Sequence, residues 1–198
     1  MQSTPLFRTA LVCATVALTG PAMAQQLEAP DPGTLPVEAP GIGPGEPEIV
    51  ETHRDWQILC NRFGEADEEQ ELCEMYQLLE TEDGPIAEVS IAALPAGSQF
   101  PAGATITTPL ETFLPSGLAF RIDAGQTRQE PFVVCMVIGC IARLGLSEEE
   151  VAAMRGGVNA FITIAPFGGA DQPIEIPVSL MGFTAAFEDL QARMPTAE

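Results

Sequence analysis

Four cysteines in two closely spaced pairs constrain the fold of this chain more than any other feature of its sequence. Cys60 and Cys73 enclose a polar segment, whereas Cys135 and Cys140 lie within the apolar stretch 132–144. Such cysteines can form structural disulfides, a redox-active pair or a set of metal ligands. The redox conditions of the compartment weigh heavily in this choice, so any targeting signal in the chain bears on it directly.

The first 24 residues have the pattern of a secretory signal peptide. Arg8 precedes an apolar core over about 9–19, and the sequence AMA at 22–24 supplies the Ala-x-Ala of a cleavage site. The core is shorter than the roughly 20 apolar residues that a transmembrane helix needs. We expect cleavage after Ala24, which would remove Cys13. The mature protein would then be periplasmic or secreted, with no transmembrane segment.

Structural disulfides are the preferred interpretation of the four remaining cysteines. A redox-active pair usually has the spacing Cys-x-x-Cys, which this chain lacks. Zinc sites need several cysteines or histidines at short spacings, and His53 is the only histidine. Four cysteines allow three connectivities, and the sequence alone does not choose among them.

The spacing favours the pairs Cys60–Cys73 and Cys135–Cys140. The first disulfide would close the polar loop between its two cysteines. In a straight strand, the Cα atoms of Cys135 and Cys140 would lie about 16 Å apart, whereas a disulfide needs roughly 4.4–6.8 Å. The chain must therefore turn between them, and Gly139 can adopt the positive φ of a tight turn.

The charge of the chain excludes several classes of partner. All eight basic residues are arginines, set against 28 acidic residues, and the formal net charge is −20. Nucleic acid requires a basic surface, and docking to anionic lipid requires basic residues too, so the charge of this chain argues against both partners. The lack of lysine also excludes Schiff-base chemistry and a phosphate-loop lysine.

The mature chain divides into a linker, one domain and a short tail. Residues 25–50 contain six prolines, four glycines, five acidic residues and no basic residue, which predicts a disordered linker. The sequence GIGPG at 41–45 follows no strand and opens no helix, so it does not indicate a nucleotide site. Residues 51–190 have the size of one domain, and 191–198 form a C-terminal tail.

Short strands dominate the predicted domain. Apolar and polar residues alternate in 56–60, 118–123 and 174–180, as is typical of strands with one buried face. Pro177 cannot donate to a neighbouring strand, so 174–180 should lie at a sheet edge. Apolar residues fill both faces of 132–138, which predicts a strand buried on both sides. Further strands are expected at 73–79, 86–94 and 158–165.

Two short helices accompany the strands, so the sequence predicts a mainly β sandwich or barrel with little helix. Ser147 and Glu150 have the spacing of a capping box that opens a helix over 148–155. Near the C-terminus, four apolar residues fall on one face of a second, amphipathic helix that we expect to pack on a sheet: Phe183, Ala186, Phe187 and Leu190.

The sequence predicts no catalytic residue, no cofactor and no metal site. The motifs of serine hydrolases, zinc proteases and phosphate loops are absent. His53 precedes the first expected strand and is interpreted as an exposed boundary residue. Five acidic residues crowd into 65–71, and calcium takes carboxylate oxygens, but the ligand spacing of a calcium loop is missing. We therefore interpret this segment as a solvated acidic loop.

The order and spacing of several motifs resemble the invasion-associated locus B family of exported bacterial proteins. The motifs are Trp56-x-x-x-Cys60, Cys73-Glu-Met-Tyr-Gln77, PLETFLPSGLAFRID at 109–123, PFVVCMVIGCIARLGL at 131–146 and IPVSLMGF at 176–183, followed by TAAFEDL. The resemblance covers about 54–190. It implies a signal peptide, four cysteines and a β-sandwich of immunoglobulin-like type in the cell envelope, with no catalytic residue to carry over. In pathogenic relatives the family is associated with entry into host cells.

Three functions are then to be distinguished. The first is a non-enzymatic interaction protein that binds a protein partner of unknown identity, with exposed apolar residues on a sheet face or loop set. The alternative is a periplasmic protein that binds a small molecule or calcium, with a concave apolar pocket or calcium-dependent stability. The third is an enzyme, which would require two acidic residues converging in a cleft.

Overall fold

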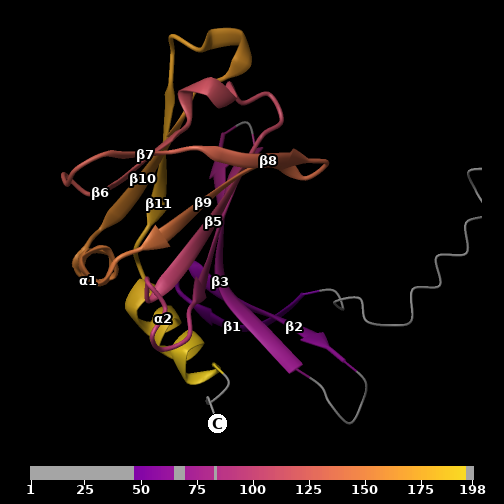
Figure 1. Cartoon of the computed structure of the whole chain (residues 1–198), viewed down its shortest axis with the longest axis vertical. Coiled ribbons are helices and arrows are strands. Elements are labelled where there is room, and N and C mark those ends of the chain that lie inside the picture. The colour runs from indigo at the N-terminus through magenta and orange to yellow at the C-terminus, as the bar shows by residue number, and fades with distance from the viewer. Residues whose placement is uncertain (1–46, 65–69, 83, 195–198) are drawn as a thin grey trace, which may run out of the picture. The chain divides into compact units, whose positions relative to one another are not determined.

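The computed structural model describes residues 47–64, 70–82 and 84–194 (Figure 1). The predicted signal peptide, most of the predicted linker and residues 195–198 of the predicted tail lie outside this range, as does most of the acidic segment 65–71. Among the described residues, no helix is long and apolar enough to cross a membrane.

Two antiparallel sheets make up most of the described chain. The larger sheet has the strand order β1-β2-β3-β4-β5-β9-β8, and the smaller one has the order β11-β10-β6-β7. The strands of the larger sheet are β1 (Glu48–His53), β2 (Trp56–Phe63), β3 (Gln70–Thr81), β4 (Gly84–Ala93), β5 (Ala102–Thr108), β9 (Gly139–Leu146) and β8 (Phe132–Met136). Those of the smaller sheet are β11 (Ile174–Ser179), β10 (Asn159–Ile164), β6 (Leu118–Ile122) and β7 (Arg128–Glu130).

The prediction of a mainly β, two-sheet fold with an amphipathic C-terminal helix is confirmed. The helices are α1 (Glu148–Gly156) and α2 (Phe183–Ala192), with two short 3₁₀ turns, η1 (Leu114–Ser116) and η2 (Phe167–Gly169). Strands β1 to β5 follow one another in the larger sheet as a meander, an order more sequential than the Greek-key order of immunoglobulin domains.

The alternating patterns correctly identified the buried faces of several strands. In β2, Trp56, Ile58 and Cys60 are buried in one common core. In β11, Ile176 and Val178 are buried as well, although Ile174 at the start of the strand is exposed. Within the described part of the chain, β11 pairs with β10 alone, so the edge position predicted from its proline is confirmed.

The domain begins earlier than predicted, because its first strand, β1, starts within the predicted linker. The linker was expected to run to residue 50, but β1 begins at Glu48 and pairs with β2 in antiparallel register from Glu48 opposite Cys60 to His53 opposite Trp56. A hydrophobic pattern does not predict β1, because acidic residues interrupt its apolar positions. Strand β1 forms its backbone hydrogen bonds with β2, whose side chains belong to the core. This pairing stabilises β1 as a strand despite the low strand propensity of its acidic residues.

Helices α1 and α2 form as their sequences predict. The Ser147 side chain accepts from the Glu150 amide, and the Glu150 carboxylate accepts from the Ser147 amide, which completes the capping box. The buried face of α2 packs on the core, where the ring of Phe183 meets that of Trp56 edge to face at 5.8 Å and stacks on Phe187 at 5.7 Å.

Strand β8 contradicts the prediction of a strand buried on both sides. It is the last strand of the larger sheet, and four of its five residues, all but Phe132, are exposed. The buried strand of this region is its neighbour β9, which lies between β5 and β8. A run of apolar residues shows only that a segment is hydrophobic, and cannot distinguish a covered strand from an uncovered edge.

Candidate functional site

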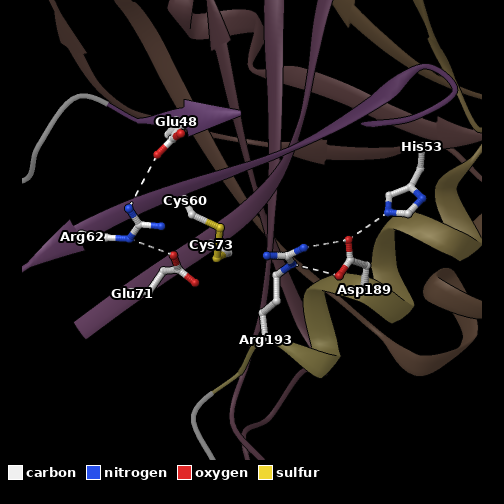
Figure 2. Close-up of a disulfide and its surroundings, with 8 residues drawn as sticks. All are labelled: Glu48, His53, Cys60, Arg62, Glu71, Cys73, Asp189 and Arg193. Carbon is white, nitrogen blue, oxygen red and sulfur yellow. Dashed lines mark hydrogen bonds and ion pairs between the residues drawn. A yellow bond between two sulfur atoms is a disulfide. The ribbon is translucent and has the colours of Figure 1, made fainter. Parts of the chain in front are cut away.

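The first disulfide joins Cys60 of β2 to Cys73 of β3, which lie opposite each other in the sheet with their Cα atoms 4.1 Å apart (Figure 2). Arg62 lies beside it and binds Glu71 of β3 through Nε at 3.3 Å and Glu48 of β1 through Nη1 at 3.7 Å. These ion pairs tie three neighbouring strands together at a solvent-exposed surface.

This region could hold a metal ion only if the disulfide were reduced. The sulfur atoms of Cys60 and Cys73 and a carboxylate oxygen of Glu71 lie within 4.8 Å of one another. Cysteine binds metals as a free thiolate. The two sulfur atoms are bonded to each other in a disulfide, so neither is available as a ligand. The calcium hypothesis rested on the acidic segment 65–71, of which 65–69 lie outside the described residues.

Next to the first disulfide, His53 of β1 and Arg193 converge on Asp189 of α2 (Figure 2). The His53 Nε2 atom lies 2.9 Å from one Asp189 oxygen, and Arg193 Nε donates to the other at 2.8 Å. The hydrogen bond from Arg193 lowers the pKa of Asp189 below its usual range, and the hydrogen bond with His53 lowers it further by a smaller amount. The interpretation of His53 as an exposed boundary residue is therefore wrong.

This trio forms a clamp between two elements of the fold. Asp189 shares its carboxylate between two partners, and the paired guanidinium keeps it ionised. The clamp fastens the N-terminal strand β1 to the end of α2, two elements far apart in the sequence. Nothing in the local sequence marks Asp189 as the partner of His53, because only the fold brings β1 and α2 together.

A second polar cluster joins the two sheets through Gln77 of β3. Its side-chain amide donates to the backbone carbonyls of Asp55 at 3.2 Å and Ser179 at 3.1 Å, and its carbonyl oxygen accepts from the Ser179 amide at 2.9 Å. The Trp56 indole also donates to the Ser179 carbonyl at 2.9 Å. Three of the quoted sequence motifs therefore meet in a structural crosslink between β2, β3 and β11.

The outer face of the larger sheet carries the only tyrosine of the chain. Partial burial, followed by the nearby Glu88 carboxylate, raises the pKa of Tyr76 to about 12. Burial also raises the pKa of Glu74 on the same strand, against the opposing effect of a hydrogen bond with Ser90. Tyr76 therefore stays protonated at neutral pH, where it can donate a hydrogen bond but is a poor base.

The second disulfide closes the hairpin between β8 and β9. Cys135 and Cys140 lie opposite each other with their Cα atoms 3.9 Å apart, so the structure has the pairing that the sequence favours. Gly139 enters β9 at φ 142°, and a Cβ there would lie 2.4 Å from the Thr108 carbonyl oxygen. Only glycine fits this position, as expected for the turn that the disulfide requires.

The tip of this hairpin is apolar and uncovered. Val137, in the turn, is 96% exposed and Ile138 is 67% exposed. Turn positions normally carry glycine, asparagine or aspartate, so two branched apolar residues are unusual there. The exposed apolar residues of the hairpin are Val133, Val134, Met136, Val137 and Ile138.

An open groove continues from this tip onto the outer face of the larger sheet. It encloses about 270 Å³ between the Ile138 side chain and residues of β3, β4 and β5, with Glu88 as its one charged lining residue. A larger open groove of about 910 Å³ lies elsewhere, between the loop 94–101 and the start of α1. Both are partly open to solvent.

Together, the fold and these sites define a class of protein: a disulfide-stabilised, two-sheet β domain with polar clusters that join its elements and an exposed apolar hairpin. Within that class, this chain belongs to the family described as invasion associated locus B (IalB) protein, whose sequence profile matches residues 56–191. The resemblance inferred from the sequence motifs is confirmed.

Two similar proteins are the invasion protein B homologs of Brucella abortus strain 2308 and of its biovar 1 strain 9-941. Each is 26% identical over 163 residues, which cover 80% of this chain and 88% of the relative. The crystal structure of invasion associated protein B from Bartonella henselae matches with a TM-score of 0.61 at 21% identity, over 73% of this chain and 97% of that one. This structural likeness supports the fold.

Proposed function

We propose that this chain is an exported, non-enzymatic protein of the bacterial cell envelope that binds a protein partner. The observation that carries the proposal is the exposed apolar hairpin of β8 and β9. Apolar patches on the surface of a monomeric protein mark interaction sites when they are contiguous. Five apolar side chains are uncovered within six consecutive positions here, on a chain whose net charge of −20 otherwise favours solubility.

Two observations support export to the periplasm or beyond. The chain begins with the pattern of a cleavable signal peptide that would end at Ala24. The described domain contains two disulfides, which form and persist in oxidising compartments. The Brucella and Bartonella relatives are named for invasion. For this chain, that supports a role at the contact between a bacterium and its surroundings.

The absence of catalysis is part of the proposal and is supported by what the reactive side chains do. His53 and Asp189 are committed to a clamp with Arg193. The four cysteines of the domain are paired in disulfides, and Tyr76 has its pKa raised to about 12. Each of these groups thus has a structural use or a protonation state that is poorly suited to acid–base or nucleophilic catalysis at neutral pH.

The test is to produce the chain with its own leader in a bacterium that carries the gene, and to follow it in cytosolic, periplasmic and extracellular fractions. We expect a cleaved protein that begins at Gln25, outside the cytosol. After crosslinking in intact cells, we expect it in a complex larger than the monomer. An uncleaved cytosolic product, or a protein that stays monomeric in every fraction, would contradict the proposal.

A further inference from the structure

We propose that the free edge of β8 takes up an extended, uncharged and apolar segment of a partner protein as an additional strand of the larger sheet. This inference rests on the proposed function and names the surface and the kind of partner. It extends the seven-strand order by one strand, beyond β8. Strand addition of this kind combines main-chain hydrogen bonds with contacts to alternate side chains.

The backbone of β8 offers unpaired groups along this edge. Among the described residues the strand pairs with β9 alone, and the short Cα distance of 3.9 Å between Cys135 and Cys140 is typical of a pair that exchanges no backbone hydrogen bonds. The N–H and C=O of Cys135 therefore point away from β9, toward the free edge. A backbone in extended conformation can bind them both, whereas lipid tails cannot.

The side chains of β8 are apolar on both faces of the sheet. Val134 lies opposite Ile141 of β9 and Met136 lies opposite Gly139, so these two residues lie on one face of the sheet, and Cys135 between them lies on the other. Val133 occupies an irregular position between two paired residues and is also exposed. A strand added at this edge would cover apolar side chains on both faces, which a flat partner surface would not.

The charge distribution selects an uncharged segment. No charged residue occurs from Pro131 to Ala142, although the chain carries a net charge of −20. A charged side chain of either sign would be buried against these apolar residues without a partner charge, which costs free energy, and the net negative charge of the chain also repels an acidic segment. Proteins commonly protect an exposed edge strand with charged residues. This edge lacks them, so it remains open to strand addition.

The disulfide prepares the edge for binding. The Cys135–Cys140 bond and the close fit at Gly139 hold the hairpin in one conformation before any partner arrives. Binding therefore does not have to order a flexible loop, which would otherwise weaken the affinity. The second disulfide thus has a use at the interface as well as in the fold.

A second copy of this chain fits the edge less well. Strand β8 has five residues, about 17 Å of extended chain, so pairing two copies of it would bury little of the roughly 800 Å² per partner that a stable complex needs. It would also bring together two chains with a net charge of −20 each. A longer segment of another protein can follow β8 and continue into the groove beside Ile138.

The experiment selects binders to the oxidised, mature protein from a displayed library of random linear peptides about ten residues long, a length that exceeds the strand. We expect uncharged sequences with alternating apolar residues to be enriched. The best peptide is then synthesised with N-methyl groups on odd or on even residues. One set should lose binding about tenfold or more and the other should keep it, because only alternate N–H groups face the edge.

Protein variants locate the binding surface. Val134→Lys and Val134→Glu should each weaken peptide binding about tenfold or more, since either charge would be buried against the added strand. The matched control is Ile49→Lys, an exposed apolar residue on β1 at the opposite edge of the same sheet, and it should leave binding unchanged. The N-methylated peptides test the inference even if a Val134 variant fails to fold.

Several results would overturn the inference. They are an enrichment of charged peptides or of none, equal effects of both methylation patterns, and peptide binding that survives both Val134 variants. Two further results would also overturn it. If the protein sediments with phosphatidylcholine or phosphatidylglycerol vesicles, the hairpin binds lipid, and if it forms a dimer that Val134→Lys dissociates, the hairpin binds a second copy of the chain. If Val134→Lys leaves the crosslinked complex in cells intact, the proposed function stands and this edge is not its site.

Discussion

At the scale of single residues, a buried polar side chain holds elements of the fold together through partners that no hydrophobic pattern reveals. Gln77 makes three hydrogen bonds to backbone groups of Asp55 and Ser179, and its side chain is almost fully buried. Its place in β3, in phase with Met75 and Leu79, does indicate that it points inward. The identity of its partners depends on how β3 meets β11.

Replacing Gln77 with alanine should therefore destabilise the domain strongly. The change leaves the amide and carbonyl of Ser179 with fewer partners in a buried place, and we expect a loss of about 2–3 kcal/mol in the free energy of unfolding. Urea denaturation measures it. Gln57→Ala, on the neighbouring strand β2, is the matched control and should cost less than about 1 kcal/mol. Equal losses for the two variants would refute the crosslink.

The clamp at Asp189 should make stability depend on pH in a defined direction. Because Arg193 and His53 hold the pKa of Asp189 below its usual range, the ionised carboxylate stabilises the folded state above the unfolded pKa of about 4. This contribution is lost as the pH falls through the lowered pKa of the folded state. The wild type should therefore exceed Asp189→Asn in stability at pH 7, and the gap should close toward pH 2.

Urea denaturation of both proteins at several pH values between 2 and 7 tests this dependence. Glu188→Gln is the control on the same helix, since its carboxylate is mostly exposed and binds Arg155 at the surface. It should change the free energy of unfolding by less than about 1 kcal/mol at any pH. A gap between wild type and Asp189→Asn that stays constant with pH would show that the carboxylate charge is not what stabilises the clamp.

At the scale of elements, each disulfide joins directly opposed residues of neighbouring antiparallel strands. Cys60–Cys73 closes a loop with a sequence separation of 13, and Cys135–Cys140 one with a separation of 5. Local sequence favoured this pairing without fixing it, because short separations and a glycine that permits a turn limit the geometry. The exposure of β8 was not determined locally, because it depends on which strand occupies the edge of the sheet.

Removing the disulfides one at a time should destabilise the domain unequally. The loop-closure relation gives about 3 kcal/mol for the longer loop and about 2 kcal/mol for the shorter one. We expect the double variant Cys60→Ser/Cys73→Ser to lose more stability than Cys135→Ser/Cys140→Ser, as measured by urea denaturation. The opposite order would mean that the hairpin disulfide acts mainly through the folded state and not through the unfolded chain.

At the scale of the whole molecule, a net charge of −20 opposes folding through self-repulsion. Seven ion pairs between arginines and acidic residues are formed by the described residues, mostly at partly exposed positions where each is worth little. Added salt screens the repulsion over long distances more than it weakens these close pairs. The excess negative charge should therefore dominate the response of the protein to ionic strength.

We accordingly expect the melting temperature to rise between about 0.01 and 0.5 M sodium chloride, as the screening length shrinks from about 30 Å to a few ångströms. Differential scanning calorimetry at pH 7 measures this shift. Potassium chloride at equal ionic strength is the control, since screening does not distinguish the two cations. A melting temperature that falls with salt would show that the ion pairs outweigh the repulsion.

The sequence by itself determined the features that local spacing and composition control. These are the mainly β class, the faces of β2 and β6, the capping box of α1, the amphipathic α2, the favoured disulfide pairs and the family. Only the tertiary structure decided which residues meet across the chain: His53 with Asp189, Gln77 with Ser179, and β1 with β2. It also decided that β8 lies uncovered at an edge. The hydrophobic pattern of a segment shows which of its residues are apolar. Whether those residues are buried depends on which other segments the fold packs against them.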